Sequence, residues 1–152
     1  MCLVVDYREK VKIAKKPLLG WKWVMTGSFK NGWYPPYYFY VKPSYKYNIK
    51  HRAQGCYNNK YFDIHHLQLE DKLSHYVVNE GFHCFVKPNR IAPAPSISPF
   101  HRDKIKLKPC IIPKDSEYVK GLQNQMASTD IIVCRNIFSA LSVYLKELFS
   151  HV

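Results

Sequence analysis

Hydrophobic and polar positions in the second half of the chain predict two strands joined by turn residues. Residues 107–112 form an apolar run, which Pro113 and the polar residues after it interrupt, and residues 130–134 form a second run. Two apolar runs separated by turn chemistry are typical of buried strands. We therefore expect these two strands at the centre of a sheet.

The same analysis gives two further strands and one loop. Residues 18–25 place Trp21, Trp23 and Met25 on one face of a strand, because side chains alternate with period two. Residues 81–86 are a second strand candidate after an Asn-Glu-Gly turn. Four prolines within 88–103 predict a loop, since proline cannot donate to a regular hydrogen-bond ladder.

The end of the chain, residues 136–152, has the periodicity of an amphipathic helix with Asn136 as its N-cap. Its large apolar residues share one arc at 100° per residue: Ile137, Phe138, Leu141, Tyr144, Leu145, Leu148 and Phe149. We expect this arc to pack on the sheet, and a homodimer contact is the alternative.

Together these elements predict one α+β domain over residues 1–152. A twisted, mostly antiparallel sheet forms a β-rich core in 1–134, which includes the proline-rich loop 88–103, and the helix 136–152 packs on it. The 152 residues suffice for one domain with a core. A hydrophobic content of 47% excludes a disordered chain.

Positive charge is concentrated in the first part of the chain. The net charge is +12, and residues 1–60 hold twelve Lys and Arg against two acidic residues, which gives +10 there. A basic segment attracts polyanions such as nucleic acid, nucleotides or acidic protein surfaces. A solvated basic face that keeps the protein soluble explains the charge equally well.

Aromatic residues are interleaved with these cations, fourteen of them between Trp21 and Phe62. Tyr38, Tyr40 and Lys42 share one face of an extended segment that follows Pro35-Pro36. Such a pattern suits stacking on bases while cations meet phosphates. It equally suits a tyrosine-rich sheet with half-buried rings, which we expect for most of them.

The remaining chemistry excludes several classes. The five cysteines have no metal-ligand spacing, Cys110 and Cys134 lie in apolar runs, and we expect no metal and no cofactor. No signal peptide and no apolar run of membrane-spanning length is present, so we expect a cytoplasmic protein without membrane contact.

Short motifs give two resemblances. The first runs through Met1-Cys2-Leu3, Glu80-Gly81-Phe82-His83-Cys84-Phe85, Cys110-Ile111-Ile112-Pro113 with Tyr118 and Gly121, and Ala127-Ser128-Thr129-Asp130-Ile131-Ile132-Val133. This order resembles a family of small uncharacterised phage and bacterial proteins over most of 1–134. The resemblance implies no function.

A more distant resemblance is to the ADP-ribosyltransferase fold, and it implies an enzyme that uses NAD. His83, Tyr118 and Asp130 would then lie near the site. The chain departs from that pattern, because His83-Cys84 stands where a Ser-Thr pair is expected and Asp130 is shorter than the usual Glu.

Three functional hypotheses follow. The first is a non-enzymatic binding protein, with a viral origin as one option, whose basic aromatic half engages nucleic acid, a nucleotide signal or a host nucleic-acid-handling protein. Its expected contacts are Lys22, Lys30, Trp33, Tyr38, Tyr40, Lys42, Lys46, Lys50 and Arg52. The second is the NAD-dependent transferase, and the third is a protein–protein inhibitor that acts through the C-terminal helix.

Overall fold

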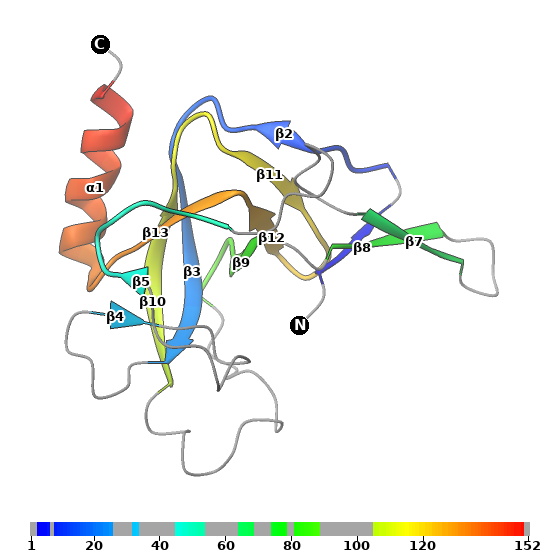
Figure 1. The fold of residues 1–152 in the computed structure, drawn as a ribbon, viewed down its shortest axis with the longest axis horizontal. Coiled ribbons are helices and arrows are strands. Elements are labelled where there is room, and N and C mark those ends of the chain that lie inside the picture. Colours follow the sequence, from blue (N-terminus) through cyan, green and yellow to red (C-terminus); the bar gives the residue numbers. More distant parts are fainter. Residues whose placement is uncertain are drawn as a thin grey trace.

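The fold is known from a computed structural model (Figure 1). It describes residues 3–6, 8–25, 32–33, 45–53, 64–68, 74–78, 81–88 and 105–150, with the backbone alone at 64–68 and 74–77. The proline-rich loop, apart from Pro88, lies outside these ranges.

Thirteen strands and one helix are present in the described residues. In chain order they are β1 (Leu3–Asp6), β2 (Lys12–Ile13), β3 (Leu18–Met25), β4 (Gly32–Trp33), β5 (Tyr45–Lys46), β6 (His51–Arg52), β7 (Ile64–Gln68), β8 (Ser74–Val78), β9 (Phe82–Phe85), β10 (Ile105–Ile112), β11 (Glu117–Lys120), β12 (Gln125–Ser128), β13 (Asp130–Val133) and α1 (Ile137–Phe149). An α+β domain with a mostly antiparallel sheet and a C-terminal helix is thereby confirmed.

The main sheet has eight strands in the order β2-β11-β12-β9-β3-β10-β13-β6, and each of these neighbours pairs antiparallel. Its longest ladder joins β3 to β10 over eight residue pairs, from Ile105 opposite Met25 to Ile112 opposite Leu18. The predicted run 107–112 lies in β10, which is central, but the predicted run 130–134 lies in β13, next to the edge strand β6. The central pair is therefore β3 and β10 and not the two predicted strands.

The sheet closes on itself because Thr129 alone separates β12 from β13. β12 pairs with β9, and β13 pairs with β10, while β3 lies between β9 and β10. Following the paired strands from β12 through β9, β3 and β10 thus leads to β13, which continues β12 along the chain. This closure creates an interior face and an exterior face.

The interior holds the largest hydrophobic cluster. Its buried members are Ala14, Val24, Trp33, Tyr47, Phe82, Cys84, Cys110, Ile112, Met126, Ile131 and Val133. The alternate residues of β10 and β13 point to the exterior, as the pairing of Ile111 with Ile132 shows. Period-two alternation thus supplies both a filled interior and an apolar outer wall.

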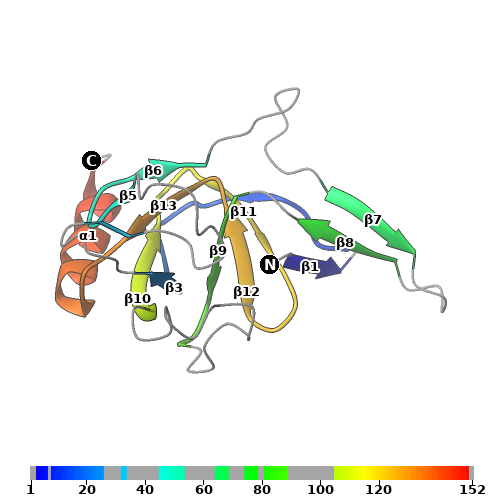
Figure 2. The same ribbon diagram turned by 60° about the horizontal axis from the view of Figure 1, so that its bottom comes forward.

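Two elements cover the exterior (Figure 2). α1 packs beside β10 and β13 through Ala140, with Val143 and Tyr144 at the edge of the contact. The three-stranded sheet β1-β8-β7 lies on the other side, where Leu3 and other apolar residues pack against Val119 and Ala127. No helix in the described part of the chain is long and apolar enough to cross a bilayer.

The packing of α1 on the sheet is as predicted, but the face it uses is different. Most of the predicted apolar arc points away from the sheet, with Phe138 79% exposed and Phe149 62% exposed. The small side chain of Ala140 allows a closer approach to Ile132 than any residue of that arc would. The helix therefore docks through one edge of its apolar side.

Candidate phosphate-binding site

The structure separates the expected contact residues into three groups. Lys30, Tyr38, Tyr40 and Lys42 lie outside the described residues. Two residues are interior, three are on the surface, and the surface group joins cations that lie later in the chain. Of the expected contacts that the structure describes, only the surface group can contribute to a binding site in this conformation.

Lys22 and Trp33 are the interior residues, and their expected role at the surface is wrong. Trp33 is fully buried, stacks on Tyr45 with ring centroids 4.7 Å apart and contacts the edge of Phe82. Lys22 lies on the interior face of β3, where its Nζ donates to the carbonyl oxygen of His83 at 2.7 Å. Burial lowers the pKa of the Lys22 ammonium, which two nearby thiols oppose.

Lys46, Lys50 and Arg52 are the surface residues, and they are carried by the segment 45–53. This segment runs along β13, since the Asn48 amide donates to the Val133 carbonyl at 2.8 Å and the Ala53 amide to Thr129 at 2.9 Å. Asn48 has a φ of 62°, in the left-handed region that Asn tolerates better than most residues. The turn thereby directs its cations outward.

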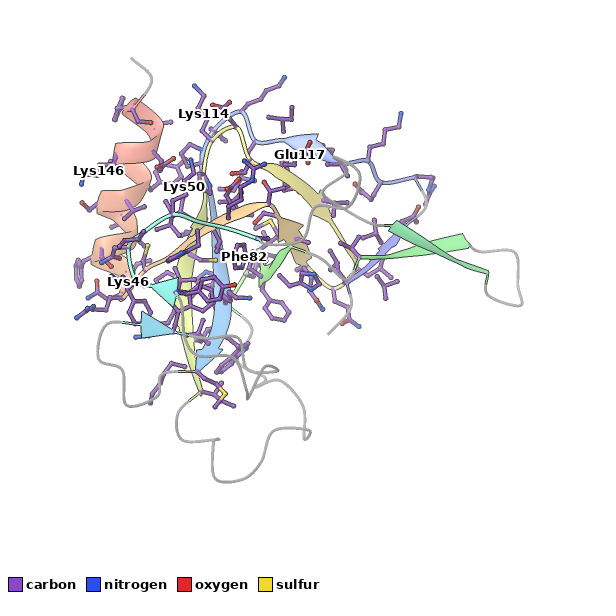
Figure 3. The ribbon with its side chains drawn as sticks, in the orientation of Figure 1. Lys46, Lys50, Phe82, Lys114, Glu117 and Lys146 are labelled. Atoms are coloured by element: carbon purple, nitrogen blue, oxygen red, sulfur yellow. The ribbon has the colours of Figure 1, made fainter. Side chains whose placement is uncertain are left out.

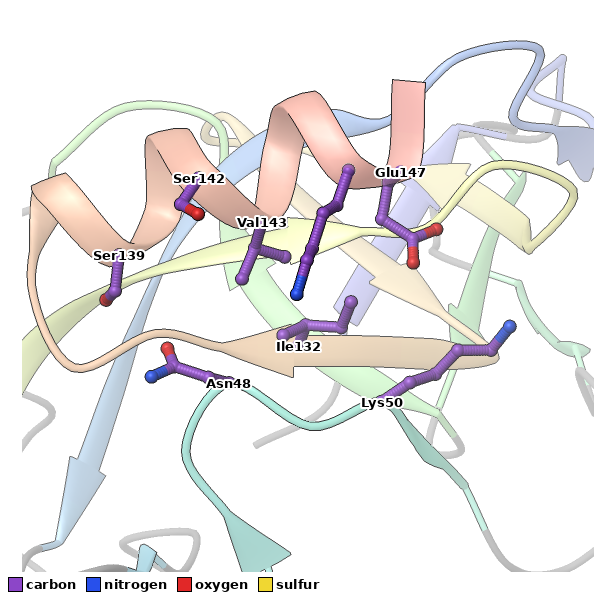
Figure 4. Close-up of a pocket in the computed structure, with 8 residues that line it drawn as sticks. Asn48, Lys50, Ile132, Ser139, Ser142, Val143 and Glu147 are labelled. Carbon is purple, nitrogen blue, oxygen red and sulfur yellow. The ribbon is translucent and has the colours of Figure 1, made fainter. Parts of the chain in front are cut away.

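A pocket of about 350 Å³ lies between this turn and α1 (Figure 4). Ile132 and Val143 form its apolar floor and wall, and the other lining residues are polar. They are Asn48, Lys50, Ser139, Ser142, Lys146 and Glu147. In Figure 4 the side chains of Asn48 and Lys50 come from the turn, and those of Ser139 and Glu147 come from the helix above it.

Two lysines from different elements line this pocket. Lys50 comes from the turn and Lys146 from the last turn of α1 (Figure 3). Among the described residues, neither makes an ion pair within 4.0 Å, although Glu147 lines the same pocket. The Ser139 hydroxyl already donates to the Asn136 carbonyl at 3.0 Å. The Ser142 hydroxyl and the Asn48 amide group, beside two lysines, are donors that suit a phosphate or carboxylate group.

A second pair of cations lies next to the pocket, around the ring of Tyr47. The Lys108 Nζ and the Arg135 guanidinium approach that ring at 5.6 and 5.8 Å. Lys108 also donates to the Arg135 carbonyl at 2.9 Å, and the Arg135 amide donates to Asn48 Oδ1 at 3.4 Å. Burial, together with the positive charges of Lys106 and Arg135, lowers the pKa of Lys108.

Asn48 connects these two pairs, because it lines the pocket and accepts from Arg135. We call the resulting surface the basic surface, defined by Lys46, Lys50, Lys108, Arg135 and Lys146. Arg52 follows on β6, opposite Asp130. Sequence analysis did not identify Lys108, Arg135 or Lys146, and only the position of Arg135 directly before the helix cap could have suggested that it meets the turn.

The residues of the enzymatic hypothesis do not converge. His83 is paired with Ala127, which is paired with Val119, whereas Tyr118 is paired with Ser128. Adjacent pairs in a sheet point to opposite faces, so His83 and Tyr118 lie on opposite sides of the sheet. Asp130 is buried on β13 and accepts from the Thr129 hydroxyl at 2.8 Å.

The described residues contain no group of three His, Cys, Asp or Glu side chains that could hold a metal ion. Comparison with known proteins gives no match to a family model, to a curated protein or to a solved structure.

Proposed function

We propose that this protein is a non-enzymatic binding protein that engages the phosphate backbone of nucleic acid through the basic surface. The observation that carries the proposal is a pocket lined by Lys50 and Lys146, neither of which has a carboxylate oxygen within 4.0 Å among the described residues. A phosphate group in this pocket would replace the water around both ammonium groups and gain charge-assisted hydrogen bonds.

The described rings support phosphate contact and not base stacking. In the basic half, Trp33 and Tyr47 are buried, and Tyr45 is half-buried with one face stacked on Trp33. Contacts to phosphate position a protein on nucleic acid without reading its bases. We therefore expect binding that does not depend on the base sequence of the nucleic acid and that weakens as the salt concentration rises.

The proposal places the protein inside a cell, where nucleic acid is present and thiols stay reduced. Cys84, Cys110 and Cys134 are free and buried, which suits a reducing compartment. The proposal includes a viral origin and antagonism of host defence through a host nucleic-acid-handling protein.

The test is fluorescence anisotropy with a labelled single-stranded and a labelled duplex oligonucleotide across a salt series. We expect affinity to fall as salt rises, because phosphate contacts release counterions. The double variant Lys50→Ala/Lys146→Ala removes two contacts and should reduce the slope of log K against log salt by roughly 1.4 to 1.8.

Two control variants bracket this result. Lys120→Ala removes an exposed lysine of β11, away from the pocket, and should leave the slope unchanged. Glu147→Gln removes the carboxylate of the pocket and should tighten binding. Two results would contradict the proposal. One is an affinity that does not change with salt concentration, and the other is an equal loss of affinity in Lys120→Ala and in the double variant.

A further inference from the structure

The exposed side of α1 carries a continuous apolar stripe. Ala140, Val143 and Tyr144 face the sheet, whereas the stripe points away from it. Its members and their exposed fractions are Phe138 at 79%, Leu141 at 55%, Leu145 at 53% and Phe149 at 62%. Residues three and four apart lie on one face of a helix, so these four form one line.

The size of the stripe is that of an interface. Two phenylalanines and two leucines exposed to this degree offer roughly 500 Å² of apolar surface, and two such faces would bury about 1,000 Å², the lower bound for a specific interface. Contiguous apolar patches of several hundred Å² on soluble proteins mark interaction sites. The stripe is thus large enough to be covered by one more helix.

We propose that the stripe is covered by the same stripe of a second copy, with the two helices antiparallel across a two-fold axis. The order Phe-Leu-Leu-Phe reads almost the same in both directions. Antiparallel packing sets Phe138 against Phe149 of the partner subunit and Leu141 against Leu145 of the partner subunit. A surface that matches itself in this way is what a two-fold interface requires.

The charges of α1 favour a second copy over other occupants. Lys146 and Glu147 are the charged residues of the helix, so it is neutral although the chain carries +12. A membrane-surface helix needs several Lys or Arg along its polar face. An equally apolar and neutral helix face matches it best.

The test is sedimentation velocity of the full chain from about 1 to about 100 µM, since dimer formation depends on concentration. We expect a species of twice the 17.9 kDa chain mass. Leu145→Glu places a charge in each half of the interface and should raise the dimer dissociation constant by at least about 100-fold. Ile13→Glu changes an equally exposed residue of β2 and should leave it unchanged.

Orientation is tested with two complementary variants. Leu141→Lys and Leu145→Glu should each be monomeric alone. Mixed together they should form a heterodimer, because the introduced lysine of one copy faces the introduced glutamate of the other only in the antiparallel pairing. Circular dichroism of each variant reports whether the helix is intact, and Leu141→Ser replaces any variant that has lost it.

Three results would overturn the proposal. The first is a wild-type chain that stays monomeric at the highest concentration. The second is a dimer that Leu145→Glu and Leu141→Ser leave intact. The third is a monomer that sediments with vesicles containing phosphatidylserine, which would identify the stripe as a lipid-binding face. A mixture that stays monomeric would overturn the antiparallel pairing. The proposal does not rest on nucleic-acid binding.

Discussion

Lys22 is a charged residue on the buried, otherwise uncharged face of β3. Its ammonium lies within the closed sheet, where it donates to the His83 carbonyl and has the Trp33 ring 6.0 Å away. Gly20, two residues earlier on the same face, leaves space that the Sγ atoms of Cys84 and Cys110 fill, each 3.2 Å from the position a Cβ would take. The interior therefore combines two thiols with one cation.

We expect Lys22→Met to stabilise the fold at neutral pH by roughly 1 kcal/mol or more, because burying an unpaired charge costs more than its hydrogen bond to His83 returns. Urea unfolding followed by tryptophan fluorescence measures the change. Lys120→Met, on the surface, serves as the matched control.

The advantage of Lys22→Met should depend on pH. Burial holds the pKa of Lys22 in the folded chain below the 10.5 of the unfolded chain. Between these two values the unfolded chain binds more protons, so wild-type stability rises with pH. The variant lacks this rise, and its advantage should shrink as pH approaches 10.5. An advantage that stays constant from neutral pH up to that value would show that Lys22 is not desolvated.

At the scale of the element, the start of α1 is determined by a capping box. The Ser139 amide donates to Asn136 Oδ1 at 2.9 Å, and the Asn136 amide donates to Ser139 Oγ at 3.2 Å. These two bonds satisfy donors that a helix end leaves without partners. They also fix the angle at which the chain leaves β13, and hence the wall of the pocket.

Asn136→Ala should destabilise the protein by about 1 kcal/mol, while Asn136→Asp keeps the acceptor and should cost little. Thermal unfolding followed by circular dichroism compares the two variants. A loss as large in Asn136→Asp as in Asn136→Ala would mean that the side chain acts by packing and not as a cap.

Elements with a clear period were predictable from the sequence. Examples are the β3 face with Trp21, Trp23 and Met25, the cap at Asn136 and the existence of the strands β10 and β13. β12 was not predicted, because Met126, Ala127 and Ser128 include one small and one polar residue and give no alternating signal, although all three are buried. β7 was not predicted, because it lies in a polar segment without a clear period, and only the Val77-Val78 end of β8 was recognised as part of a strand.

The candidate site was predictable only in part. Lys46, Lys50 and Arg52 belong to one basic segment, so a local charge pattern reveals them. Lys108 on β10 reaches the ring of Tyr47, and Lys146 on α1 lines the pocket. Both positions beside the segment 45–53 depend on how the sheet folds. The docked face of α1 was missed for a related reason, since a wide apolar arc does not reveal which of its edges meets the sheet.

At the scale of the whole molecule, closure of the sheet protects its thiols. Cys84 and Cys110 lie in the interior on β9 and β10, and burial raises the pKa of the Cys110 thiol. Cys134 lies outside the closed sheet under α1, where burial raises its pKa to about 12. A thiol reacts as its thiolate, so the raised pKa values make Cys110 and Cys134 unreactive. A hydrogen bond to Cys110 lowers the pKa of the Cys84 thiol, so Cys84 is protected by its burial alone.

Alkylation by iodoacetamide at mildly alkaline pH, followed by mass spectrometry, measures this protection. We expect Cys84 and Cys110 to be modified at one common rate, which increases with urea as global unfolding does, because neither can be reached without opening the sheet. Fast modification of Cys84 in the native protein, with Cys110 still protected, would show that the closed sheet opens locally at β9.

The position of the pocket on the flank of α1 has a consequence for ligand length. If two copies pair through that helix, two pockets are held at one fixed separation. A polynucleotide long enough to reach both would then gain avidity, since its second contact forms at a high effective concentration. A mononucleotide reaches one pocket and would gain no avidity. Dimerisation would therefore make the affinity depend on the length of the polynucleotide.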